Sequence, residues 1–166
     1  MAGIKINVDD KEVRKALDRL ADPDLIKEAL GGIGEVLVEN TRDRIKQGID
    51  VDGNPFTPLA PITQQLKKKN KDKPLVHDGY LLASLAYQLV NGGTGLEYGS
   101  DLPYAALQHF GGTIRPKNAK MLQFGKGSGI FAKESHIPAR PFIGLTQQDE
   151  DEILDNLAHF IDNQLK

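Results

Sequence analysis

The sequence predicts an α+β fold in which a small antiparallel sheet packs against a long helix in the N-terminal half and a C-terminal helix, with two extended loops. Three observations support this prediction. One apolar stripe at helical spacing runs unbroken from Ile26 to Ile45, and another follows Thr146. Between these stripes, short apolar segments alternate with glycine-rich turns, which is typical of β-hairpins.

Residues 4–20 are expected to form a strand followed by a short helix. Apolar and polar residues alternate at the start, which predicts a strand with one buried face. Asp9 or Asp10 can cap the helix that follows. The apolar strand residues are Ile4, Ile6 and Val8, and the helix carries Val13, Leu17 and Leu20 at helical spacing.

The longest helix is predicted over residues 23–47. Asp22 is a favourable N-cap residue, and Pro23 suits the first helical position, where a backbone N–H has no helical partner. Gly48 is expected to end the helix in a left-handed conformation. The buried stripe is expected to consist of Ile26, Ala29, Leu30, Ile33, Leu37, Thr41 and Ile45.

The remaining elements are shorter. The lysine-rich stretch is predicted on a helix from Ile62 to about Lys69, and Asp78 is expected to cap a brief helix over 79–83. Two hairpins are predicted, one pairing 85–89 with 96–99 and the other pairing 120–124 with 130–134. A two-turn helix from Tyr104 to Phe110 and a C-terminal helix capped by Thr146 complete the chain, and the latter is expected to bury Ile153, Leu157, Ile161 and Leu165.

Length and composition favour one domain, residues 1–166, with flexible loops at about 49–61 and 117–134. A chain of 166 residues can bury a core without disulfides or metal, and it contains no cysteine. No apolar run approaches the ~20 residues of a membrane span, so we expect no membrane partner, and the lack of cysteine fits a protein made in a reducing cytoplasm. The net charge of −2 gives no overall attraction to nucleic acid.

The inventory of reactive residues disfavours an enzyme. The four histidines, His77, His109, His136 and His159, share no metal-ligand spacing, so neither a metal nor another cofactor is expected. No serine occupies a nucleophile elbow, and the glycine-rich loop around Ser128 lacks the spacing of a phosphate-binding loop. The consecutive acids from Asp149 to Glu152 are explained by the positive end of the last helix.

A cluster of lysines leaves two interpretations open. It is either a solvated helix face or a site of non-specific contact with the phosphates of duplex DNA. No aromatic residue lies between Phe56 and Tyr80, which argues against the reading of single strands by base stacking. The cluster consists of Lys67, Lys68, Lys69, Lys71 and Lys73.

Four short motifs, taken in order, resemble the phage virion morphogenesis family of tail-completion proteins in Mu-like phages. They are Gly53-Asn54-Pro55-Phe56-Thr57-Pro58-Leu59, the stretch from Leu75 to Leu85, the stretch from Tyr104 to Gly111, and Ile137-Pro138-Ala139-Arg140-Pro141-Phe142-Ile143-Gly144-Leu145. The resemblance spans roughly residues 10–165. It assigns structural roles to Gly53, Phe56, Leu75, Gly79, Leu81, Tyr104, His109, Phe110, Gly111, Pro138, Arg140, Pro141 and Phe142.

The resemblance implies a structural part of the virion that closes the tail end or joins the tail to the head. It is expected in the bacterial host cytoplasm during assembly and then in the neck or tail of the virion. Its implied partners are copies of itself in a ring, with six as the expected number, the tail tube, a head-completion protein and duplex DNA in the channel. Intramolecular packing is favoured for Phe110 and Phe142, whereas Arg140 could pair with a carboxylate of its own chain or of a neighbour. The expected interface residues are Phe56, Pro58, Arg115, Lys126 and Arg140.

Three other functions stay open at this stage. They are a DNA-binding module that uses the lysine cluster, a transient assembly factor absent from the finished particle, and an enzyme of unrecognised geometry.

Overall fold

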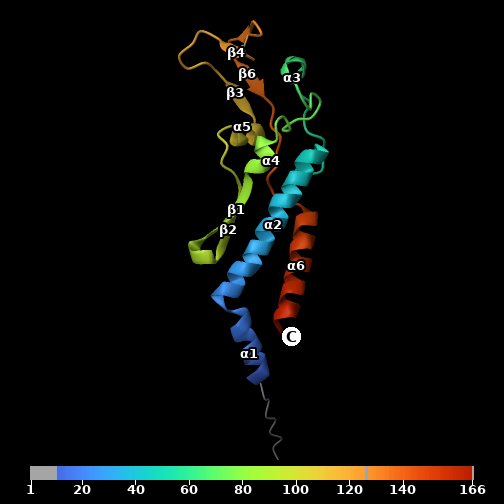
Figure 1. The fold of residues 1–166 in the computed structure, drawn as a ribbon, viewed down its shortest axis with the longest axis vertical. Coiled ribbons are helices and arrows are strands. Elements are labelled where there is room, and N and C mark those ends of the chain that lie inside the picture. Colours follow the sequence, from blue (N-terminus) through green and yellow to red (C-terminus); the bar gives the residue numbers. More distant parts are fainter. Residues whose placement is uncertain (1–10, 126, 166) are drawn as a thin grey trace, which may run out of the picture.

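The computed structural model describes residues 11–125 and 127–165. The molecule is elongated and organised around α2, with α1 at one end and a group of short strands and helices at the other (Figure 1). The helices are α1 (Lys11–Leu20), α2 (Pro23–Gln47), α3 (Pro61–Leu66), α4 (Tyr80–Ser84), α5 (Ala105–Phe110) and α6 (Gln147–Leu165), with a 3₁₀ turn η1 (Asn91–Gly93). The strand predicted over residues 4–8, with the cap at Asp9 or Asp10, lies outside the described residues.

The predicted limits of α2 are confirmed. The Asp22 carboxylate accepts a hydrogen bond of 2.9 Å from the backbone N–H of Asp24, and Pro23 occupies the first helical position. Gly48 ends the helix at φ 81°, where a residue with a Cβ would be strained. These caps fix where the long helix begins and ends.

Three two-stranded antiparallel ribbons take the place of one small sheet. β1 (Leu85–Val90) pairs with β2 (Gly95–Ser100), and β4 (Leu122–Phe124) with β5 (Ile130–Ala132), which confirms both predicted hairpins. The sequence did not predict the third ribbon, in which β3 (Gly112–Ile114) pairs with β6 (Ser135–Ile137). The α+β class is confirmed, with the strands divided among separate ribbons.

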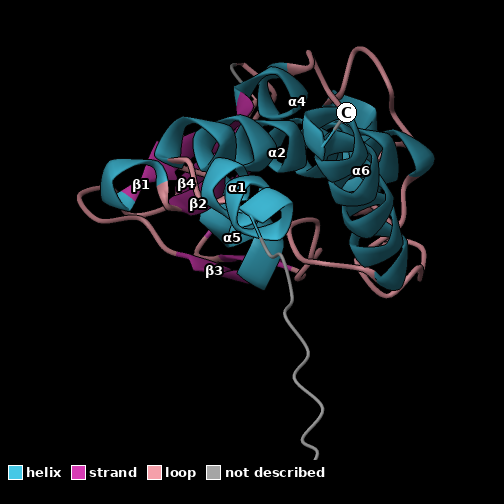
Figure 2. Ribbon diagram, turned by 90° about the horizontal axis from the view of Figure 1, so that it is seen from below, coloured by secondary structure: helices cyan, strands magenta, loops and turns pink. Residues whose placement is uncertain are grey.

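The core lies where the C-terminal half of α2 meets the other elements. Figure 2 shows α2 between the β1–β2 hairpin on one side and α6 on the other. The apolar stripe of α2 is buried from Leu37 to Ile45 and only half-buried from Ile26 to Ile33. The fully buried apolar cluster consists of Val38, Ile45, Phe56, Leu81, Leu85, Ala105 and Phe142.

Two predicted helical stripes are wrong in part. In α1, the side chain of Leu17 is 60% exposed, so it does not belong to a buried face. In α6, Ile161 and Leu165 are exposed, whereas Ile153 and Leu157 are half-buried as predicted and share the inward face with Phe160 and Gln164. Spacing alone did not distinguish the inward row of residues from the exposed row that contains Ile161 and Leu165, because both rows repeat every three or four residues.

Both short helices predicted in the middle of the chain are present as α3 and α4, but the end of the first and the cap of the second are wrong. The lysine-rich stretch is not helical, because α3 ends at Leu66 and Lys67 has extended backbone angles (φ −70°, ψ 132°). Asp78 does not cap α4, whose N-cap is Gly79 at φ 86° with no side-chain hydrogen bond. The Asp78 carboxylate lies instead 2.9 Å from His77 Nδ1 and 3.9 Å from Lys69 Nζ.

The contact between α2 and β1 depends on the absence of a side chain at Gly34. A Cβ placed there would lie 2.4 Å from the ring of Tyr87, so Gly34→Ala is expected to cost about 1–3 kcal/mol through overpacking. Gly32→Ala in the same helix is the matched control, since a Cβ at that position meets nothing within 4 Å. It should stabilise the helix by up to about 1 kcal/mol. Urea unfolding distinguishes the two, and equal stabilities would contradict the proposed contact.

Candidate assembly surfaces

Arg140 lies between two prolines and holds the loop 49–61 against the body of the protein. Its side chain is buried, with a residue exposure of 4%. Nε donates to the Thr57 carbonyl at 2.8 Å, Nη2 to the Pro58 carbonyl at 3.1 Å, and Nη1 to Gln108 Oε1 at 3.5 Å. Among the described residues no carboxylate lies within ion-pair distance of the guanidinium. Within the described part of its own chain, Arg140 therefore binds backbone carbonyls and has no carboxylate partner, and a pairing with a carboxylate of a neighbouring subunit stays a prediction.

The loop 49–61 has a defined local structure. The Asp50 carboxylate accepts from the backbone N–H groups of Asp52 at 2.9 Å and Asn54 at 2.8 Å, which closes a turn. At the end of the turn the Phe56 N–H donates to the Gly48 carbonyl at 2.8 Å, and the Phe56 ring enters the core. Phe56 thus fills the structural role expected of it, and its buried ring offers no surface to a neighbouring subunit. Pro58 is exposed.

His109 connects α5 to the segment that follows Arg140. Its Nδ1 accepts from the backbone N–H groups of Phe142 at 3.3 Å and Ile143 at 3.4 Å, and its ring lies edge-on to that of Phe142. Burial lowers the pKa of the imidazole below its usual 6.5. The nitrogen that faces these two donors must stay unprotonated for the contact to persist.

Acidification is therefore expected to weaken the fold through His109. The unfolded chain takes up the proton near pH 6.5 and the folded chain only at a lower pH, so this stabilisation is complete above 6.5 and is lost as the pH falls through the lowered pKa. Urea midpoints measured over this range report the loss. His109→Asn keeps an acceptor that does not titrate and should flatten the pH dependence. Equal slopes for the wild type and this variant would contradict the assignment.

The prediction that Phe110 and Phe142 both pack inside the subunit is wrong for Phe110. Phe142 is fully buried, but Phe110 is 76% exposed at the end of α5. It belongs to a set of exposed apolar side chains at the end of the molecule that carries α3, α5 and the short ribbons (Figure 1). The set consists of Tyr80, Tyr104, Phe110, Ile114, Met121 and Phe131. Exposed apolar groups gathered at one end are typical of a binding surface.

The lysine cluster forms an irregular loop. Lys67 Nζ donates to the carbonyls of Lys73 at 2.8 Å and Val76 at 2.7 Å, so its ammonium group faces its own chain. Desolvation lowers the pKa of Lys67, although nearby Asp72 opposes the shift. The other four lysines, Lys68, Lys69, Lys71 and Lys73, are exposed. Their contact with duplex DNA stays a prediction.

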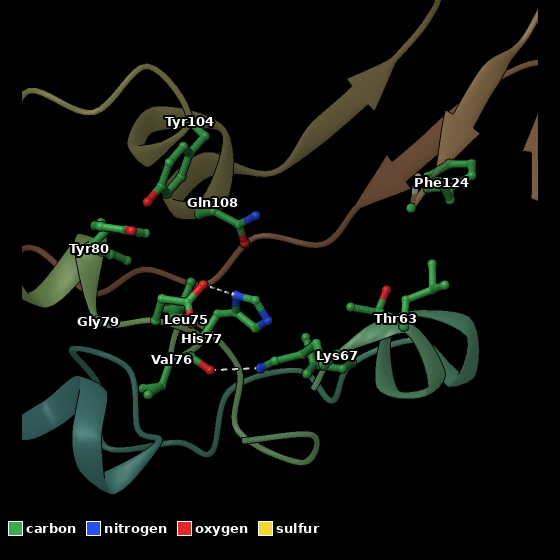
Figure 3. Close-up of a pocket in the computed structure, with 15 residues that line it drawn as sticks. Thr63, Lys67, Leu75, Val76, His77, Gly79, Tyr80, Tyr104, Gln108 and Phe124 are labelled. Atoms are coloured by element: carbon green, nitrogen blue, oxygen red, sulfur yellow. Dashed lines mark hydrogen bonds and ion pairs between the residues drawn. The ribbon is translucent and has the colours of Figure 1, made fainter. Parts of the chain in front are cut away.

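A groove opens beside this loop, with a volume of about 450 Å³. Figure 3 shows Tyr80 and Tyr104 at one side and Phe124 at the opposite side, with Gln108 between them. The apolar lining residues are Leu59, Leu66, Leu75, Val76, Leu81, Tyr80, Tyr104 and Phe124. The polar ones are Thr63, Lys67, His77, Asp78 and Gln108. A largely apolar lining with a few polar groups is suited to an apolar side chain or helix face.

The remaining motif residues are structural by position. Gly79 and Gly111 adopt positive φ, and a Cβ at Gly111 would lie 2.6 Å from the backbone nitrogen of Ala139. Arg115 Nη2 forms an exposed ion pair of 2.8 Å with Glu134 across the β3–β6 ribbon, and Lys126 lies outside the described residues. The others, Gly53, Leu75, Leu81, Pro138 and Pro141, lie in turns, in the core or in the connections described above.

The ionic contact that joins α2 to α6 was not predicted from the sequence. Arg44 Nη1 donates to both oxygens of the buried Asp149 carboxylate, at 3.0 and 2.7 Å. Thr146 caps α6 as predicted, with its hydroxyl accepting from the Asp149 N–H at 3.1 Å, while the Asp149 carboxylate accepts from the Thr146 N–H at 2.9 Å. This reciprocal arrangement is a capping box. An acidic residue three positions after a threonine is its sequence signature, so the capping role of Asp149 could have been predicted.

Neither a metal site nor a membrane span is found in the parts of the chain that the structure describes. No group of three or more His, Asp or Glu side chains among residues 11–125 and 127–165 converges as metal ligands would. Over the same residues no helix is both long and apolar enough to cross a membrane.

A sequence profile of the phage virion morphogenesis family matches residues 8–162, and the chain therefore belongs to that family. It is 29% identical to the Mu-like prophage FluMu G protein 2 of Haemophilus influenzae over 166 residues, which is 100% of both chains. No solved structure matches it significantly. The protein thus takes part in phage virion morphogenesis.

Proposed function

We propose that the protein is a structural, non-enzymatic part of the virion that completes the tail end or joins the tail to the head as an oligomeric ring. The observation that carries the proposal is the family match over residues 8–162, combined with exposed apolar side chains gathered at one end of the subunit. A subunit that lies between large partners needs apolar surface to bind them, and the exposed side chains at this end supply such surface. The proposed partners are copies of itself, the tail tube and a head-completion protein.

The exposed end supports assembly through more than one surface. Phe110 and Phe131 present aromatic rings from α5 and from the β4–β5 ribbon, and aromatic side chains are enriched at the centres of interfaces. Pro58 and Arg115 are exposed and keep their proposed interface role. Phe56 and Arg140 act by shaping this end, since Arg140 fixes the loop that carries Pro58.

Removing the protein from the phage that encodes it tests the proposal. Heads and tails are expected to form separately and fail to join, and purified protein added to the extract should restore joined particles. Electron microscopy with labelled antibody should then place the protein at the head-proximal end of the tail. Normal joined particles formed without the protein would overturn the proposal. Restoration with no protein detectable in the purified particles would assign it instead to transient assembly.

A further inference from the structure

The outward face of α6 carries an apolar stripe that no other element among residues 11–125 and 127–165 covers. Leu154, Ala158, Ile161 and Leu165 recur every three or four residues and therefore lie on one side of the helix. All four are exposed, and Leu154 reaches 64%. They lie next to the inward face of α6, which packs on α2 and α1. We call these four residues the outer stripe.

The outer stripe is flanked by negative charge. Asp151, Asp155 and Asp162 are exposed and follow one another along the same edge of the stripe. The helix contains no lysine or arginine to neutralise them. A partner for this face therefore needs an apolar surface with positive charge beside it.

The groove beside the lysine loop has these properties. Its lining is mostly apolar, and the adjoining segment 67–73 contains five lysines and one aspartate. Lys67 lines the groove itself, and Lys69 Nζ lies 3.9 Å from Asp78, which also lines it. Lys68, Lys71 and Lys73 have no ion pair with the described residues. The positive charge beside the groove is therefore carried by the adjoining loop, in which Lys71 lines a separate hollow with Pro61 and Gln64, and it is available to carboxylates of another molecule.

The groove and the outer stripe cannot meet within one subunit. The groove is formed by α3, α5 and the β4–β5 ribbon at one end, whereas α6 lies along α2 toward the opposite end, next to α1 (Figure 1). A contact between them must join two copies. Because the two surfaces differ, each copy would use its stripe toward one neighbour and its groove toward the other. Such a contact is heterologous, and it forms a ring when the rotation between copies closes.

We propose that the outer stripe of one copy docks in the groove beside the lysine loop of the next copy, as an amphipathic helix in a groove. Leu154, Ile161 and Leu165 supply the apolar anchors of the helix, and Asp151, Asp155 and Asp162 face the lysines. The inference rests on the self-assembly in the proposed function and adds the two surfaces that carry it.

Two complementary variants test the contact. Tyr80→Ser/Tyr104→Ser removes the exposed aromatic rim of the groove and leaves the stripe intact, whereas Leu154→Lys disrupts the stripe and leaves the groove intact. Each alone should raise the dissociation constant of self-association, measured by sedimentation of the full-length protein, by about tenfold or more. In an equimolar mixture, the intact stripe of the groove variant can dock in the intact groove of the stripe variant. No second contact is possible, so the mixture should form dimers and nothing larger. Circular dichroism verifies that each variant is folded.

Leu89→Lys is the matched control, since Leu89 is an exposed leucine on β1, away from both surfaces. It should associate as the wild type does, and raised salt should weaken the wild-type association. Wild-type protein that stays monomeric at its highest soluble concentration overturns the inference, as do stripe and groove variants that associate normally or a mixture that forms no dimers. Lys68→Glu/Lys71→Glu that loses duplex DNA binding but associates normally also overturns it.

Failure of this contact is distinguishable from failure of the proposed function. Stripe and groove variants that still restore joined particles and associate normally would refute the docking and leave the joining role intact. Docking verified in solution, with particles that join normally without the protein, would refute the joining role and leave the docking intact.

Discussion

Replacing Asp149 with alanine is expected to lower the free energy of unfolding by about 3–5 kcal/mol. The substitution removes the buried carboxylate and leaves the guanidinium of Arg44 in the interior without its counter-charge. It also removes an acceptor for the Thr146 N–H and for Asn40 Nδ2, at 2.9 Å each. Equilibrium unfolding in urea at neutral pH measures the loss.

Asp151→Ala is the control for this substitution. Asp151 lies in the same first part of α6 and carries the same charge, but it is exposed and bonds only to Gln147 among the described residues, at 3.0 Å. Its loss should change the stability by no more than about 0.5 kcal/mol. Similar effects of the two substitutions would show that helix-end charge, and not the buried contact, explains the acidic turn.

The pKa of Asp149 gives the same contact a pH dependence. Burial raises this pKa, but hydrogen bonds from the Thr146 N–H, Asn40 and the Thr146 hydroxyl, with the charge of Arg44, outweigh burial and lower it below 3.8. The stabilisation is thus complete above pH 3.8 and is lost as the pH falls through the lowered value.

Replacing Phe142 with alanine is expected to destabilise the protein by about 3–5 kcal/mol, because it leaves a cavity in the core. The ring is 0% exposed and lies edge-on to that of His109, with centroids 5.3 Å apart. Phe110→Ala is the matched control: it removes the same side chain from the neighbouring motif, where the ring is solvent-exposed, and should cost no more than about 0.5 kcal/mol. Thermal unfolding followed by circular dichroism compares them. A loss at Phe110 as large as that at Phe142 would mean that Phe110 packs within the subunit.

The elements that the sequence predicted correctly are those with local signals. The caps Asp22, Gly48 and Thr146 act within a few residues of themselves, and both hairpins are joined by glycine-containing turns. The β3–β6 ribbon was not predicted because each strand has only three residues and the two strands lie far apart in the sequence. Gly112, for example, pairs with Ile137. Lysine has a high helix propensity, which favoured a helix over the lysine stretch. In the structure the helix ends at Leu66, and Lys67 Nζ donates to the carbonyls of Lys73 and Val76 in a loop.

The candidate surfaces were harder to predict than the fold, for a physical reason. Arg140 lies between two prolines, which predicts a constrained segment. Its hydrogen-bond acceptors could not be predicted, because they are backbone carbonyls and every residue type has one. Likewise, Phe110 and Phe142 are the same residue type in similar motifs, and only tertiary packing decides which of them is buried. The outer stripe of α6 could be read from spacing only once the inward face was known.

The contact between Arg44 and Asp149 also bears on how the protein folds during translation. The two residues are 105 positions apart in the chain, so synthesis at about 5–20 residues per second separates their appearance by roughly 5–20 s. Over that time α2 has formed its guanidinium-bearing face but lacks the carboxylate that neutralises it. A nascent chain that stops before Asp149 therefore keeps a charged, unfinished interior and is a substrate for chaperones and proteases. Only a chain synthesised through α6 can complete this contact and neutralise the buried guanidinium of Arg44.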